Sequence, residues 1–124
     1  MKYKMIQRVN PQDRSQSKQY AAPVNDGRIT KTDITKELAL TSSLSRGDVS
    51  NVIENLIDVM PKYLLMGKSV NLGEFGTLRL SFSSEGVNDA SEFTVSKIHG
   101  VKVVFTPGSE FRNVLKNMKF ETSV

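Results

Sequence analysis

The hydrophobic positions of this chain repeat at two different spacings. Apolar and polar side chains alternate over residues 2–9, with Tyr3, Met5 and Val9 on one side, and this predicts a β-strand with one basic face. Steps of three and four then predict a long amphipathic helix. Its apolar positions are Val49, Val52, Ile53, Leu56, Ile57, Met60, Tyr63 and Leu64. Both strands and helices are therefore expected, which is an α+β class of fold.

Capping and turn residues divide the first half of the chain. Residues 15–18 are polar enough to predict a mobile loop, and residues 19–24 predict a second extended segment. Thr30 or Thr32 can cap a short helix that runs to about Leu40. Ser45 is the expected N-cap of the long helix, and Gly67 is expected to end it.

Alternation returns after the long helix. Residues 70–72 and 78–82 predict two strands around the glycine-rich turn 73–76. Residues 83–91 show no periodicity and predict a loop or hairpin tip. Strand patterns then run through Phe93 and Val95 and again through Val101, Val103 and Phe105, before residues 107–109 begin a last helix. A β-region of about three strands is expected between the long helix and this closing one.

Four segments in this order resemble the HU/IHF family of bacterial histone-like, nucleoid-associated proteins. They are 29–38 (ITKTDITKEL), 45–56 (SRGDVSNVIENL), 70–78 (VNLGEFGTL) and 105–116 (FTPGSEFRNVLK). In the third segment, Phe75 and Gly76 fall on the hallmark pair of the family. The resemblance implies an HU/IHF-like fold with two N-terminal helices, a three-stranded antiparallel β-region with an arm, and a C-terminal helix. It also implies an intertwined homodimer whose paired arms embrace DNA at the minor groove.

The first 28 residues lie outside the ordinary pattern of that family. They resemble the N-terminal extension of the longer HU-like proteins. We therefore predict a basic extension of strand and loop over residues 1–28, followed by an HU/IHF-like DNA-binding domain over residues 29–124.

The expected arm tip departs from the family pattern. In the family this tip carries an Arg-Asn-Pro wedge and many basic residues. Residues 83–93 here contain no proline, lysine or arginine, and they include Glu85, Asp89 and Glu92. Because phosphates repel carboxylates, this tip argues against sharp bending of DNA by an inserted wedge.

Composition narrows the possible functions. The 124 residues include no cysteine, which excludes disulfides, thiolate metal sites and a cysteine nucleophile. His99 is the only histidine and has no second histidine or cysteine nearby as a partner. No catalytic residue, metal site, cofactor or small-molecule substrate is therefore predicted, and the protein is not expected to be an enzyme. No apolar run suits a signal peptide or a membrane span, so a cytoplasmic location at the nucleoid is expected.

The charge of the chain favours a polyanionic partner. The formal net charge is +4, and residues 1–30 carry six basic residues against two acidic ones. Lysine and arginine side chains that neutralise phosphates would supply most of the affinity for DNA. The candidate DNA contacts are Lys2, Lys4 and Arg8 on the strand of the N-terminal extension (residues 1–28, the leader), Arg79 on the hairpin, and Lys97 and Lys102 on the returning strand.

Two functions remain open at this point. The preferred one is a homodimeric architectural protein that binds and condenses double-stranded DNA with little sequence specificity. The alternative is a dimeric HU-fold scaffold for protein–protein interaction that has lost DNA bending, which the acidic tip favours. In either case the apolar stripe of the long helix is larger than one protomer would leave exposed, so a partner subunit is expected.

Overall fold

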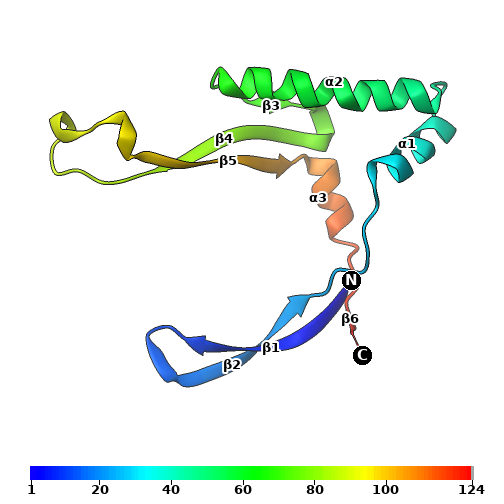
Figure 1. Ribbon diagram of the computed structural model, residues 1–124. Coiled ribbons are helices and arrows are strands. Elements are labelled where there is room, and N and C mark those ends of the chain that lie inside the picture. The colour runs from blue at the N-terminus through cyan, green and yellow to red at the C-terminus, as the bar shows by residue number, and fades with distance from the viewer. Residues whose placement is uncertain (124) are drawn as a thin grey trace.

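The computed structural model describes residues 1–123, which form a mixture of helices and small sheets (Figure 1). The long elements are β1 (Lys2–Asn10), β2 (Asp13–Pro23), α1 (Lys31–Leu40), α2 (Arg46–Leu65), β4 (Gly76–Ser84), β5 (Ile98–Pro107) and α3 (Ser109–Leu115). The short ones are β3 (Val70–Asn71), β6 (Glu121–Thr122) and the 3₁₀ turns η1 (Gly73–Phe75), η2 (Ala90–Glu92) and η3 (Val95–Lys97). The expected α+β class is confirmed.

Both long helices begin at reciprocal capping boxes. The Ser45 hydroxyl accepts the backbone N–H of Asp48, and the Asp48 carboxylate accepts the N–H of Ser45, at 3.1 Å in each case. Thr30 and Asp33 repeat this arrangement at α1. The hydrogen bonds from the backbone and side chain of the cap residue hold the pKa of each aspartate below its ordinary value. Of the two caps proposed for the first helix, Thr30 is the one used.

A three-stranded antiparallel sheet, in the order β3-β4-β5, lies beside α2 (Figure 1). Leu78 pairs with Phe105 and Leu80 pairs with Val103, so these apolar side chains share one face. Leu78 and Leu80 are partly buried, whereas Arg79 between them is exposed. The sheet therefore has an apolar face and a polar face, as the alternation predicted.

Three aromatic rings connect the sheet to the last helix. Phe75 of η1 lies 5.4 Å from Phe105 of β5 and 5.8 Å from Phe111 of α3, measured between ring centroids. The Glu74 carboxylate accepts the Ser109 hydroxyl at 2.7 Å, next to the start of α3. These contacts fix the direction in which α3 leaves the sheet.

The leader forms a hairpin that pairs with the other end of the chain. β1 and β2 are antiparallel, from Tyr3 opposite Pro23 to Val9 opposite Ser17, and β6 adds in parallel to β1. The Ser123 N–H donates to the Tyr3 carbonyl at 2.8 Å. In Figure 1 the β1–β2 and β4–β5 hairpins extend to the same side of the molecule, and α3 lies between their bases.

Two of the predicted segments are wrong. Residues 15–18 are not a loop but part of β2, because β1 supplies hydrogen-bond partners to a stretch whose polar side chains conceal its strand character. Phe93 and Val95 do not lie on a strand. Hydrogen bonds from Phe93 to Ala90 and from Lys97 to Thr94 close 3₁₀ turns there, and β5 begins only at Ile98.

The interior of the chain is small. Among residues 1–123 the buried side chains are Val49, Leu64 and Thr35 on the two long helices, and the only other buried residue is Gly76 of β4. The chain exposes 10,479 Å². A compact monomer of 13.8 kDa exposes roughly 6,600 Å². The difference comes from the two projecting hairpins and from apolar faces that no second layer covers.

Candidate nucleic-acid interface

The polar face of the β4–β5 hairpin brings two of the predicted contacts together. Arg79 lies opposite Val104 and Ser81 lies opposite Lys102, so Arg79 and Lys102 are diagonal neighbours on one face. Diagonal Cβ atoms in an antiparallel pair are about 7–8 Å apart. Both residues are exposed, and neither forms an ion pair within residues 1–123. The other paired residues of this face are Thr77, Ser81, Ser83, His99, Val104 and Thr106, none of which is acidic.

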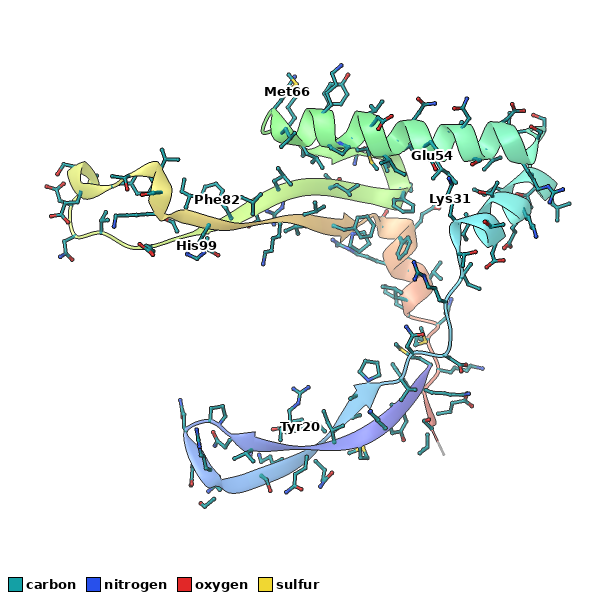
Figure 2. The ribbon with its side chains drawn as sticks, viewed as in Figure 1. Tyr20, Lys31, Glu54, Met66, Phe82 and His99 are labelled. Atoms are coloured by element: carbon teal, nitrogen blue, oxygen red, sulfur yellow. The ribbon has the colours of Figure 1, made fainter. Side chains whose placement is uncertain are left out.

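A β-bulge in β5 determines which residues lie on the outer part of this face. Ser81 pairs with Lys102 and Ser83 pairs with His99, so three steps along β5 match two along β4. Gly100 lies within the bulge with φ +67°, a left-handed conformation that favours glycine. The extra residue keeps His99 on the polar side, and Figure 2 shows His99 and Phe82 pointing to opposite sides of the hairpin.

Lys97 does not lie where the sequence predicted. It ends η3 instead of lying on the returning strand, because the chain from Thr94 is held in a 3₁₀ turn. Its ammonium lies 3.8 Å from a carboxylate oxygen of Glu85. The structure therefore separates Lys97 from Arg79 and Lys102 and gives it an acidic neighbour.

The hairpin tip is a compact, acidic set of turns. The Glu85 N–H donates to the Lys97 carbonyl at 3.0 Å, which closes the tip at its base. The Asp89 carboxylate accepts the Ser91 N–H at 3.2 Å and begins η2. The predicted loop is confirmed from Glu85 onward, although β4 extends two residues further than expected, to Ser84.

The leader hairpin carries the remaining predicted contacts. Lys4 and Arg8 share a face of β1 with Ile6, as the alternation predicted, and Lys2 begins the same row. The Lys2 ammonium lies 3.3 Å from an Asp26 carboxylate oxygen and is thereby partly neutralised. Arg8 forms no ion pair among the described residues, and its guanidinium carbon lies 5.7 Å from the Tyr20 ring centroid.

Two further residues of the leader face were not among the predicted contacts. The register places Lys18 directly opposite Arg8, and Tyr20 directly opposite Ile6. Lys18 was missed because the polar run around it predicted a loop. The alternation of β1 already predicted a basic face. Pairing a second strand with β1 would have added Lys18 and Tyr20 to that face.

Within residues 1–123 no three His, Asp or Glu side chains are grouped so that they could hold a metal ion. None of the described helices combines the length and apolar character needed to cross a membrane.

Comparisons with known proteins identify the family. The family model HU-HIG, an HU domain fused to wHTH, Ig, or glycine-rich motif, matches residues 1–122. Integration host factor subunit alpha of Haemophilus influenzae is 33% identical over 93 residues, which cover 73% of this chain and 97% of that protein. A crystal structure of a candidate DNA-binding protein from Bacteroides vulgatus shares the fold, with a TM-score of 0.61 and 19% identity.

The extent of these matches differs. The structural alignment covers 98% of this chain but 47% of the Bacteroides vulgatus chain, so this chain spans about half the length of that protein. The family match includes the leader hairpin as well as the helices and the β4–β5 hairpin. The chain therefore belongs to the HU-HIG family, within the HU/IHF-like group of bacterial histone-like DNA-binding proteins that its sequence segments resemble.

Proposed function

We propose that this protein is a non-enzymatic, homodimeric architectural protein of the nucleoid that binds double-stranded DNA through phosphate contacts, with little sequence specificity. The observation that carries this function is the pair of Arg79 and Lys102 on a face without acids. That face belongs to a hairpin whose outer part extends beyond α2 (Figure 1). Exposed cations on a two-stranded ribbon can approach a DNA backbone closely, because no helix or loop of residues 1–123 covers them.

The homodimer is supported by the apolar surface that one protomer leaves open. Val52 and Ile57 on α2 are 52% and 56% exposed, and Val103 on the apolar face of β5 is 57% exposed. A soluble protein rarely leaves so much continuous apolar surface in water. A second copy that supplies the same two faces would cover them.

Low sequence specificity is supported by the kind of contacts available. Lys and Arg side chains that meet phosphates position a protein on DNA without reading its bases. The tip offers no proline wedge and carries three carboxylates, so we expect binding without a sharp intercalative kink. Lys2, Lys4 and Arg8 add phosphate contacts from the leader. Lys97 contributes least, since Glu85 already neutralises part of its charge.

The test is fluorescence anisotropy of a labelled random-sequence duplex, titrated over a series of salt concentrations. We expect the logarithm of the dissociation constant to rise linearly with the logarithm of the salt concentration, with a slope of about 0.9 for each phosphate contact. Replacing Arg79 and Lys102 by glutamine should lower that slope by about two for each bound protomer, if each residue meets one phosphate. Lys36→Gln with Lys68→Gln is the matched control, because it removes two exposed charges from outside this face.

One outcome would favour the scaffold instead. A folded dimer that fails to bind the duplex even at low salt would overturn the proposed function. The acidic tip, with Glu85, Asp89 and Glu92 exposed, would then be the surface that a basic protein partner recognises.

A further inference from the structure

The positive charge of this protein is concentrated in one element. The β1–β2 hairpin, residues 2–23, contains five basic residues, Lys2, Lys4, Arg8, Arg14 and Lys18, and one acidic residue, Asp13. Its net charge is +4, which equals the net charge of the whole chain. The other 102 residues contain twelve basic and twelve acidic side chains and are neutral as a whole. The helices and the β4–β5 hairpin therefore supply no net long-range attraction for a polyanion, which comes from the leader hairpin.

The register concentrates this charge on one side of the hairpin. Lys4 and Arg8 on β1 share a face with Lys18 on β2, and Arg8 and Lys18 are directly opposite each other. Like charges in that relation destabilise a strand pair. Neither cation has an acidic partner within residues 1–123, since Asp13 lies at the turn and accepts both the N–H and the hydroxyl of Ser15. An external anion between the two cations would remove this repulsion.

The same region has the shape and order of a binding surface. Arg8, Lys18 and Tyr20 line an open hollow of about 490 Å³ that continues to the turn of the hairpin. The Arg8 guanidinium lies over the Tyr20 ring, and Tyr20 is 45% exposed, so the ring orients the cation without covering it. β6 holds the base of the hairpin through the Glu121 and Ser123 N–H groups. A phosphate would therefore meet cations that are already ordered, at a lower entropic cost than a flexible tail requires.

We propose that the Lys4–Arg8–Lys18 face of the leader hairpin is the principal phosphate-binding surface of this protein for duplex DNA. This inference rests on the proposed function, because it concerns the same ligand. It assigns to the leader the long-range attraction that the acidic tip of the β4–β5 hairpin cannot provide. Arg79 and Lys102 then make the shorter-range contacts of a surface without net charge.

The experiment compares three variants of the full chain in the duplex titration. The hairpin variant is Lys4→Gln, Arg8→Gln, Lys18→Gln; the sheet variant is Arg79→Gln, Lys102→Gln; and the matched control is Lys36→Gln, Lys68→Gln, Lys116→Gln. We expect the hairpin variant to lose about tenfold or more in affinity, and to lower the logarithmic salt slope by about 2.7 for each bound hairpin. The control, which removes the same charge, should lose much less.

A fourth variant separates charge from folding. Lys4→Arg, Arg8→Lys, Lys18→Arg keeps the charge of the hairpin while changing each side chain, and we expect it to bind like the wild type. Circular dichroism checks that the β content is the same in all four proteins. If the hairpin variant folds and binds like the control, the inference is overturned while DNA binding stands.

Two other outcomes would also overturn the inference. If the wild type does not bind the duplex, the proposed function and the inference both fail. If the wild type instead binds vesicles that contain anionic lipid, with the same dependence on the hairpin residues, the partner of this face is a membrane surface and not DNA.

Discussion

Gly76 shows why a single position in this fold accepts only one residue type. Its φ is +144°, and a Cβ atom built there would overlap the Thr106 carbonyl oxygen and would lie 2.6 Å from a ring carbon of Phe105. The absence of a side chain lets β4 start directly against β5, and it leaves room for the Phe75, Phe105 and Phe111 rings to meet. In the hallmark pair, Phe75 therefore supplies a ring that packs, and Gly76 leaves the space that β5 and the rings occupy.

This geometry predicts the effect of Gly76→Ala. We expect a loss of about 2 kcal/mol or more in the free energy of unfolding, because the added methyl group meets backbone as well as an aromatic ring. Denaturant titration followed by circular dichroism measures the change. Gly47→Ala is the matched control, since Gly47 lies in α2 with negative φ and its Cβ would meet only the Ser45 hydroxyl, at 3.7 Å. Equal stability of the two variants would contradict the packing argument.

The elements differ in how well the sequence predicts them. The apolar stripe and the Ser45 cap determine α2 through local patterns, so its position was predicted correctly. β2 depends on pairing with β1, and its polar stretch around Lys18 carries no local pattern that separates a strand from a loop. The position of Lys97 was predicted wrongly for a different reason, because hydrogen bonds between residues close in sequence bend the chain into 3₁₀ turns where alternation predicted a strand. Arg79 and Lys102 lie on strands, as the clear alternation around them predicted, and their contacts with DNA stay a prediction.

The attachment of the leader hairpin to β6 can be tested at the level of these elements. The N–H groups of Glu121 and Ser123 donate to the carbonyl oxygens of Met1 and Tyr3. The double variant Glu121→Pro, Ser123→Pro removes both donors. Loss of two hydrogen bonds should make local opening of the hairpin roughly tenfold more frequent. Limited trypsin digestion, followed by mass spectrometry, should then show faster cleavage after Lys4 and Arg8. The alanine pair at 121 and 123 keeps both N–H groups and is the control.

Cleavage in α2 reports on the rest of the molecule in the same digest. The Lys62 site lies within the helix, away from β6, and its cleavage rate should stay unchanged. If the leader sites are cut at the same rate in the proline and alanine variants, the pairing with β6 does not hold the hairpin in place.

At the scale of the whole molecule, the exposed area indicates whether a single chain or an assembly of chains is stable. One protomer exposes 10,479 Å², against roughly 6,600 Å² for a compact chain of this mass. Its described interior contains two buried hydrophobic side chains, Val49 and Leu64. Such a core cannot offset the conformational entropy that folding removes from a chain of this length. The apolar faces of α2 and of β4–β5 therefore have to be covered for the fold to be stable, and a second copy offers the same faces in return.

This argument predicts that folding and association are one process. The midpoint of thermal unfolding should rise with protein concentration, because mass action favours a folded dimer over unfolded chains. Ile57→Lys places a charge on the exposed apolar stripe of α2 and should lower the midpoint strongly, whereas Asn55→Lys on the polar side should change it little. Light scattering gives the mass of the folded species. A midpoint that is independent of concentration, together with a monomeric mass, would show that one chain is stable alone, and the proposed homodimer would then be wrong.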